Sequence, residues 1–154
     1  MADYLIAKTN EDYKTAASLF KEYAAWLNID LGFQHFEKEL KGLKEMYAEA
    51  DCGIILCKKE NNFIACVAIR KINTDIAELK RMFVKPAYQQ KGTGKELLEK
   101  AIKLAGDLQY SYIRLDTLNY MTPAINLYKQ YGFYKIEAYY NNPNKTAVYF
   151  EKKL

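Results

Sequence analysis

The residues of this chain that are most suited to chemistry lie in segment 89–95, which reads Gln-Gln-Lys-Gly-Thr-Gly-Lys. The segment follows an apolar-rich run over residues 76–84 and precedes a helical pattern over residues 96–108. A glycine-bearing turn between a strand and a helix gathers free backbone N–H groups at the positive end of the helix dipole, and both features favour a bound phosphate. The segment therefore predicts a site for a phosphate-bearing ligand.

Three phosphate-binding patterns can be compared with this segment. A P-loop requires a glycine five residues before Gly94 and a serine or threonine after the lysine, but these positions hold Gln89 and Glu96. A dinucleotide-binding turn requires a small residue three positions after Gly94, where the chain has Leu97. The third pattern, (Gln/Arg)-x-x-Gly-x-(Gly/Ala), is satisfied in full. The segment alone leaves open an ordinary glycine turn that binds nothing, because short glycine motifs often occur by chance.

The elements around the segment predict a single α/β domain over residues 1–154. Apolar spacing indicates about four helices, over residues 10–28, 34–49, 96–108 and 122–131, with Asn10 as the N-cap of the first. Apolar runs indicate seven strands, over residues 4–8, 53–59, 63–72, 76–84, 112–117, 133–140 and 146–152. The order β-α-α-β-β-β-α-β-α-β-β predicts a mixed, mostly antiparallel, seven-stranded sheet with helices on both faces.

Composition limits the partners of this domain. The net charge of +4 is small and the lysines alternate with acidic residues, which favours a small anionic ligand over nucleic acid. No apolar run approaches the ~20 residues of a membrane span, and the N-terminus lacks the pattern of a signal peptide. Three cysteines in apolar surroundings indicate reduced thiols in a cytoplasmic protein. With one histidine and no CxxC pair, no metal site is expected. We expect a monomer or a homodimer.

Three segments between about Ile76 and Tyr140 resemble the GCN5-related N-acetyltransferase (GNAT) family. Residues 78–86, Glu-Leu-Lys-Arg-Met-Phe-Val-Lys-Pro, resemble its central strand, and residues 89–95 match its pyrophosphate loop. The spacing of its last motif, N-x4-A-x3-Y-x3-G-F, is found at Asn119, Ala124, Tyr128, Gly132 and Phe133. The resemblance implies an acetyl-CoA-dependent N-acetyltransferase that acts on an amine of a small molecule or peptide. A catalytically silent acyl-CoA-binding regulatory domain on the same fold is the alternative.

The resemblance also implies where acetyl-CoA binds. The pyrophosphate would contact the backbone N–H groups of residues 90–95, where glycine permits close approach and positive φ. The pantetheine arm would pair with the backbone of Met82 and Val84, provided that the next strand leaves these groups free. Asn119 would hold pantetheine or begin a helix. The residues expected to bind the cofactor are Met82, Phe83, Val84, Gln89, Gln90, Lys91, Gly92, Thr93, Gly94, Lys95, Asn119 and Tyr128.

Acetyl transfer needs a deprotonated amine, a stabilised oxyanion and a proton for the departing thiolate. The resemblance makes Tyr128 the acid that protonates the sulfur, and the backbone N–H of Met82 the group that polarises the thioester carbonyl. Glu78 is the candidate base, directly or through a water, since it lies four residues before Met82 and strand alternation would put both on one face. A solvated or salt-bridged strand residue is an equally good interpretation of Glu78.

The acceptor amine is expected between the two N-terminal helices and the C-terminal turn. Trp26, Phe33 and Gln34 lie at the junction of the two predicted helices. A Tyr-Tyr-x-Asn-Pro run, which contains Tyr139, Tyr140 and Asn142, resembles a run that lies near the acceptor in some bacterial members of the family. A tyrosine-rich strand edge is the alternative interpretation of this run.

Overall fold

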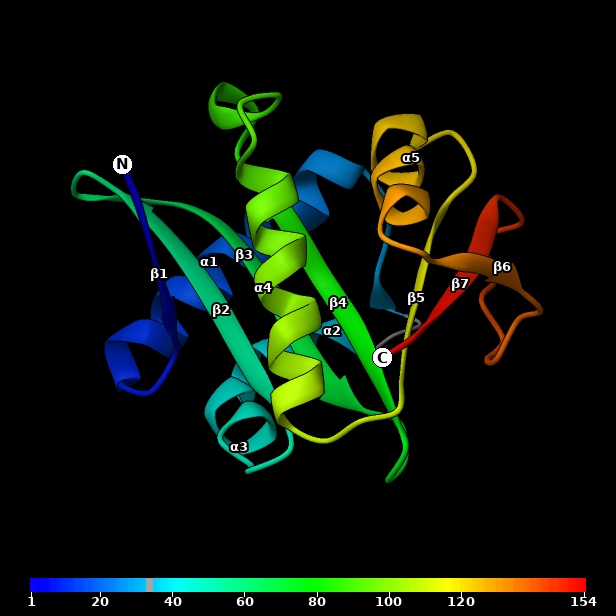
Figure 1. Cartoon of the computed structure of the whole chain (residues 1–154). Coiled ribbons are helices and arrows are strands. Elements are labelled where there is room, and N and C mark those ends of the chain that lie inside the picture. Colours follow the sequence, from blue (N-terminus) through cyan, green and yellow to red (C-terminus); the bar gives the residue numbers. More distant parts are fainter. Residues whose placement is uncertain (33–34) are drawn as a thin grey trace.

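One seven-stranded sheet forms the centre of the molecule (Figure 1). The computed structural model of the chain describes residues 1–32 and 35–154, and in this part the strand order is β1-β2-β3-β4-β5-β7-β6. The β4–β5 pair is parallel and the other pairs are antiparallel, which confirms the predicted sheet. The strands are β1 (Ala2–Ile6), β2 (Gly53–Lys59), β3 (Asn62–Lys71), β4 (Ile76–Val84), β5 (Tyr112–Leu118), β6 (Tyr134–Ile136) and β7 (Ala147–Lys153).

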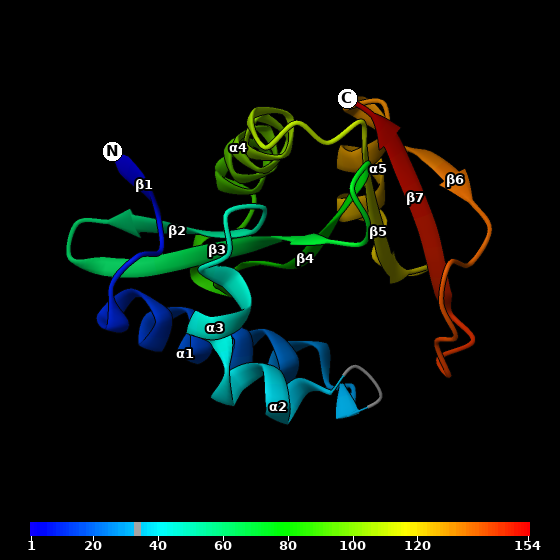
Figure 2. The same cartoon turned by 90° about the horizontal axis from the view of Figure 1, so that it is seen from below.

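Helices cover both faces of this sheet (Figure 2). The first face carries α1 (Asn10–Leu27), α2 (Phe36–Lys41) and α3 (Leu43–Tyr47), and the second carries α4 (Thr93–Asp107) and α5 (Thr122–Gln130). Each face buries its own apolar cluster, with Phe20 of α1 in the first and Leu97 of α4 in the second. The predicted order of elements is confirmed, but the second predicted helix is divided, so the described residues form five α-helices.

Local sequence explains where the N-terminal helices begin and break. The Thr9 hydroxyl accepts a hydrogen bond from the backbone of Asp12 at 3.1 Å, and the Asp12 carboxylate accepts one from the backbone of Thr9 at 3.0 Å. This reciprocal capping box makes Thr9 the N-cap of α1, so the predicted cap at Asn10 is wrong by one residue. The helix predicted over residues 34–49 is interrupted at Gly42, because glycine is a poor helix former in the interior of a helix.

A β-bulge lies in β4, beside the residues predicted to bind the cofactor. Where the register between β3 and β4 shifts, β4 contains one residue more than β3. Arg81 lies at this shift and has a φ of 56°. Leu79 and Met82 both pack into the cluster beneath α4, although residues three apart on a regular strand face opposite sides. Glu78, which is adjacent to Leu79, therefore faces the other side of the sheet. The expectation that Glu78 and Met82 share a face is wrong because the bulge shifts the alternation.

β4 and β5 are paired over only part of their length. Their parallel ladder joins residues 76–78 to residues 112–114, and in the described chain it goes no further. Beyond this point β4 stays paired with β3, while β5 stays paired with β7. The two halves of the sheet therefore separate at the end where α5 and the loop before α4 lie (Figure 1).

The first strand and the last two strands differ from their predicted bounds. β6 covers Tyr134–Ile136 instead of residues 133–140. Tyr139 and Tyr140 lie beyond the end of the β6–β7 ladder, and their hydroxyl groups donate hydrogen bonds to Glu78 and Asp116. β1 starts two residues earlier than predicted, and β7 agrees with the prediction to within one residue.

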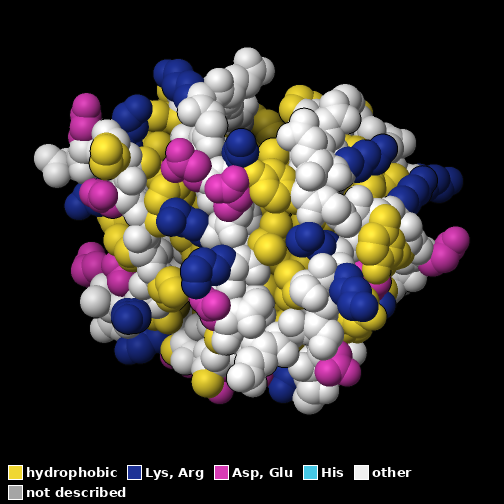
Figure 3. Space-filling view, in the orientation of Figure 1, with side chains coloured by type: hydrophobic (Ala, Val, Ile, Leu, Met, Phe, Trp, Pro, Cys, Tyr) yellow, Lys and Arg dark blue, Asp and Glu magenta, His cyan; other side chains and the backbone are white. Residues whose placement is uncertain are grey.

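The surface carries mixed charge. Lys and Arg side chains are interspersed with Asp and Glu over the face that α4 crosses (Figure 3). No helix in the described part of the chain is both long enough and apolar enough to cross a membrane. The cysteines are free thiols, and Cys57 and Cys66 are buried, in agreement with the apolar surroundings noted in the sequence.

Candidate active site

A cavity of about 540 Å³ opens where β4 and β5 separate. It brings together residues from α1, β4, the loop before α4, β5, α5 and the turn before β7. The described residues that border it include Tyr23, Trp26, Leu31, Lys80, Arg81, Met82, Phe83, Val84, Gln89, Gln90, Gly92, Gly94, Lys95, Asp116, Tyr120, Tyr128, Asn142 and Asn144. Most of the predicted cofactor residues and part of the predicted acceptor residues therefore share one space.

Backbone N–H groups gather at the α4 end of this cavity. Gly92 is the residue before α4, has a φ of 87°, and has no side chain to cap the helix. The first bond of the helix runs from Glu96 N to Gly92 O at 3.1 Å. The N–H groups of Thr93, Gly94 and Lys95 consequently have no protein partner within the described residues. Together with the helix dipole, these groups form a site suited to an anion.

Side chains of the loop hold its shape. Gln89 donates from Nε2 to the carbonyl of Val84 at 2.9 Å, which ties the loop to the end of β4. Lys91 donates from Nζ to the carbonyl of Ala87 at 3.3 Å. Lys95 borders the cavity, whereas Lys91 and Thr93 do not. Among the predicted loop residues, Lys91 therefore supports the loop in this structure, and its contribution to ligand binding stays a prediction.

The edge of β4 forms the middle of the cavity. Lys85 N donates to the carbonyl of Ile64 on β3 at 2.9 Å. Because successive residues of a strand direct their backbone groups to opposite neighbours, the N–H groups of Met82 and Val84 face β5. The ladder with β5 has ended before these residues, so neither N–H has a strand partner in the described chain. The sequence prediction required that β5 leave the backbone groups of this edge free, and the N–H groups of Met82 and Val84 meet this requirement. The carbonyl of Val84 does not, because it accepts a hydrogen bond from the Gln89 amide.

Tyr128 of α5 borders the cavity with a buried phenol. Its side chain is 6% exposed, its ring centroid lies 5.7 Å from that of Phe133, and its hydroxyl has no hydrogen-bond partner within the described residues. Burial raises the pKa of Tyr128 above its ordinary value of 10, and the nearby Tyr23 and Asp116 raise it further. The phenol therefore keeps its proton at neutral pH and is free to donate it.

Glu78 lies outside the lining of the cavity. Its carboxylate accepts a hydrogen bond from the hydroxyl of Tyr139 at 2.7 Å and lies 3.8 Å from Nζ of Lys80. Burial and the charge of Glu78 raise the pKa of Tyr139, which does not border the cavity either. Burial also lowers the pKa of Lys80, and the charge of Glu78 opposes that shift. The role of Glu78 as a base stays a prediction, and its carboxylate here is engaged by two protein groups.

Asp116 borders the cavity from β5, and the sequence interpretation missed it. Its Oδ2 atom accepts hydrogen bonds from the hydroxyl of Tyr140 at 2.6 Å and from Nδ2 of Asn142 at 3.3 Å. The predicted acceptor residues Tyr140 and Asn142 are thus brought together on one carboxylate. A signal was available, because the apolar residues Ile113 and Leu115 alternate along the predicted strand and put Asp116 on the face opposite the core beneath α4.

The other predicted site residues have different positions. Trp26 borders the cavity, is 42% exposed, and has its ring 5.9 Å from that of Phe83. Asn119 lies in an exposed turn after β5, where its N–H donates to the carbonyl of Thr146 at 2.8 Å, and it does not border the cavity. The predicted acceptor residues Phe33 and Gln34 lie outside the described residues.

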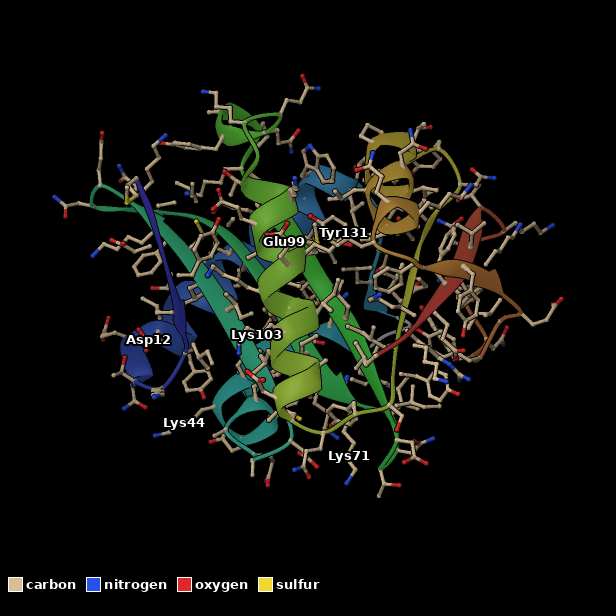
Figure 4. The ribbon with its side chains drawn as sticks, in the orientation of Figure 1. Asp12, Lys44, Lys71, Glu99, Lys103 and Tyr131 are labelled. Atoms are coloured by element: carbon tan, nitrogen blue, oxygen red, sulfur yellow. The ribbon has the colours of Figure 1, made fainter. Side chains whose placement is uncertain are left out.

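A contact between the two helices of the second face supports the position of Tyr128. Tyr131, at the end of α5, and Glu99 of α4 point toward one another, and the hydroxyl of Tyr131 donates to the Glu99 carboxylate (Figure 4). The described residues contain no group of three or more His, Cys, Asp or Glu side chains that could hold a metal ion. The groups of the cavity with a candidate chemical role are backbone N–H groups, the phenol of Tyr128 and the carboxylate of Asp116.

The chain belongs to the acetyltransferase (GNAT) family, whose family model matches residues 17–133. An uncharacterized N-acetyltransferase of Schizosaccharomyces pombe is 32% identical over an alignment that covers 96% of this chain and 91% of that protein. The predicted family is confirmed, and the predicted enzyme class, an N-acetyltransferase, is confirmed at the level of the family.

Solved structures share the fold. An acetyltransferase from Streptococcus agalactiae has a TM-score of 0.81 at 19% identity, with coverage of 99% of this chain and 98% of that chain. A GNAT family acetyltransferase from Elizabethkingia anophelis with acetyl-CoA bound has a TM-score of 0.61 at 23% identity, with coverage of 74% and 83%. These likenesses confirm the predicted fold.

Proposed function

We propose that this chain is an acetyl-CoA-dependent N-acetyltransferase that moves the acetyl group to a primary amine of a small molecule or peptide by direct attack in a ternary complex. One observation carries the proposal: a single cavity joins the unpaired N–H groups of α4, the free edge of β4 at Met82, and the phenol of Tyr128. The family of the chain and the acetyl-CoA bound to the Elizabethkingia protein support the choice of acyl donor.

The proposed donor matches the order of groups along the cavity. Acetyl-CoA has a pyrophosphate at one end of its arm, two amides in the middle, and a thioester at the other end. The α4 N–H groups would hold the pyrophosphate, because helix N-termini with free donors bind phosphate. The backbone carbonyl of Met82 and the N–H of Val84 would pair with the pantetheine amides, which leaves the N–H of Met82 for the thioester. This arrangement would bring the thioester close to Met82 and Tyr128.

The proposed chemistry assigns each proton a donor and an acceptor. The acceptor's ammonium loses one proton to solvent before the attack. Its nitrogen then forms a bond to the thioester carbon, and the N–H of Met82 stabilises the negative charge on the oxygen. The C–S bond breaks as Tyr128 donates its proton to the sulfur. The nitrogen's second proton restores the phenol, so the products are an amide, free thiol and one released proton.

Two measurements on the purified chain test the proposal. Acetyl-CoA should raise the melting temperature by mass action, and thiol should be released when a panel of primary amines is added. An unchanged melting temperature at millimolar acetyl-CoA would contradict the proposal that the cavity binds coenzyme A, for a transferase and for a silent binding domain alike. A thermal shift without thiol release for any amine would favour the catalytically silent acyl-CoA-binding domain.

The variant Tyr128→Phe examines the proposed acid. It should lower kcat about 100-fold or more, because a positioned general acid contributes roughly 10²–10⁴-fold, while the Kd for acetyl-CoA stays within twofold. Tyr110→Phe is the matched control, since it removes a hydroxyl that donates to the Asp51 carbonyl and lies outside the cavity. A kcat that is equally changed in both variants would remove Tyr128 from the chemistry.

A further inference from the structure

Asp116 is the one acidic side chain that borders the cavity among the described residues. Three basic side chains also border it, namely Lys80, Arg81 and Lys95. Arg81 forms a buried ion pair with Glu39, and Lys80 lies 3.8 Å from Glu78, so acidic partners outside the lining compensate these two charges. Lys95 belongs to the α4 end. The charge at the β5 end of the cavity is therefore that of Asp116.

The carboxylate of Asp116 is held in place by two hydrogen bonds and forms no ion pair within the described residues. Both of its hydrogen-bond partners, Tyr140 and Asn142, are neutral donors, and both donate to Oδ2. Asn142 also donates to the Tyr140 hydroxyl at 3.2 Å, which connects the three side chains. Oδ1 makes no hydrogen bond within the described residues. One oxygen of a fixed, negatively charged group is thus available to a ligand.

This carboxylate lies close to the groups proposed for the chemistry. Asp116 and Tyr128 border the same cavity, and Asp116 follows the end of the β4–β5 ladder by two residues. Its charge also contributes to the raised pKa of Tyr128, after burial and Tyr23. The rings of Tyr23 and Trp26 and the side chain of Leu31 also border the cavity and provide apolar walls.

We infer that Asp116 binds the ammonium group of the acceptor, and that it selects cationic primary amines with an apolar body and no carboxylate beside the amine. The inference rests on the proposed function and names the substrate class for that site. A carboxylate next to the amine would be repelled by Asp116, because like charges in a partly buried site disfavour binding. Glu78 is the competing residue, but its carboxylate is engaged by Tyr139 and Lys80 and lies outside the lining.

Binding of the amine can be measured apart from turnover. Trp26 is the only tryptophan of the chain and borders the cavity, so its fluorescence reports the occupied site. The probes are 2-phenylethylamine and hexylamine, with phenylalanine as the carboxylate-bearing counterpart, each added to the full chain saturated with coenzyme A. Thiol release with acetyl-CoA gives KM and kcat for the same compounds.

We expect Asp116→Asn to raise the amine Kd and KM at least about tenfold, since a hydrogen bond to a charged group contributes roughly 1.5–3 kcal/mol. In the wild type, phenylalanine should bind at least about tenfold more weakly than 2-phenylethylamine, and Asp116→Asn should reduce that preference. The acetyl-CoA Kd should stay within twofold. Asp107→Asn, which changes an exposed carboxylate paired with Lys103 at the end of α4, should leave all of these constants unchanged.

The outcomes separate this inference from the proposed function. An amine Kd that is unchanged in Asp116→Asn, or a larger increase in Glu78→Gln, would overturn the assignment of Asp116 even if other amines are acetylated. Failure of both amines to change the Trp26 fluorescence would overturn the substrate class. Amine binding that depends on Asp116 without any thiol release would uphold the assignment and count against the transferase reaction.

Discussion

The two ends of the cavity are built in different ways. At the α4 end one continuous segment, residues 89–95, provides nearly every group, and most of these are backbone N–H groups. At the other end Tyr23 comes from α1, Asp116 from β5, and Asn142 from the turn before β7. A site made of backbone depends on local conformation, whereas a site made of side chains depends on how distant elements pack. Substitutions at the two ends should therefore fail for different reasons.

A buried ion pair between Arg81 and Glu39 joins two distant segments of the chain beside the cavity. Arg81 donates from Nε and Nη2 to the two carboxylate oxygens of Glu39, each at 3.0 Å, and both residues are at most 5% exposed. The guanidinium also lies 5.1 Å from the ring centroid of Phe36. This pair connects α2 to the bulge of β4, directly before Met82. The pair therefore joins α2 to a residue of β4 that borders the cavity.

The largest effect is expected at the backbone end. Gly92→Asp should weaken acetyl-CoA binding on the order of 100-fold or more, because a carboxylate about 4 Å from a phosphate charge is repelled by several kcal/mol. The backbone of Gly92 has a φ of 87°, which adds strain for any residue with a side chain. A Cβ at this position would meet no atom within 4 Å. Isothermal titration with acetyl-CoA measures the change.

Gly92→Asn is the matched control for charge. Asparagine has the shape of aspartate and tolerates positive φ, so the affinity should fall less than about tenfold. Amine binding, read from Trp26 fluorescence, should change little in either variant, because the two ends share no side chain. Equal losses in the Asp and Asn variants would mean that conformation, and not an anion site, explains the glycine.

The same contrast explains what the sequence could predict. Gly92 and Gly94 could be placed because their spacing within one strand–turn–helix run determines their geometry, and Tyr128 because it matches the spacing of the family's last motif. Strand alternation could have placed Asp116 on the face opposite the core beneath α4, but its importance depends on which turn residues donate to it and on where the β4–β5 ladder ends. The face of Glu78 was predicted wrongly because a bulge leaves no clear mark in the run Glu-Leu-Lys-Arg-Met. The order of elements was predictable because helical and strand periods are local properties.

A smaller effect is expected when the buried Glu39–Arg81 ion pair is broken. Glu39→Gln should lower the free energy of unfolding by about 3 kcal/mol, because removal of one partner leaves a buried charge uncompensated. In the variant that remains folded, KM for the amine should rise more than the Kd for acetyl-CoA, since Arg81, the partner of Glu39, borders the cavity and would lose its compensating charge. Urea unfolding followed by circular dichroism measures the stability.

Glu11→Gln provides the matched control for this substitution. Glu11 pairs with Lys14 at 3.4 Å on the surface of α1, with side chains 83% and 75% exposed, and an exposed pair contributes only about 0–1 kcal/mol. If both variants lost the same small amount of stability, the Glu39–Arg81 pair would not stabilise the fold more than an exposed ion pair does. If KM and the acetyl-CoA Kd rose together in Glu39→Gln, the two ends would be coupled and the contrast drawn above would be wrong.

The smallest effect concerns pH at the acceptor end. Burial, opposed by Arg81 and aided by the charge of Asp116, raises the pKa of Tyr23 from 10 to about 12. A phenol whose pKa is higher in the folded state stabilises the fold fully below pH 10, and this contribution is lost as the pH rises toward 12. Between pH 8 and pH 11 the wild type should therefore lose about 1 kcal/mol more stability than Tyr23→Phe does, as measured by urea unfolding at both pH values.

Gly92→Asn should lose as much as the wild type, because the backbone end contains no titrating phenol. A Tyr23→Phe variant with the pH dependence of the wild type would show that the folded protein does not raise the pKa of Tyr23.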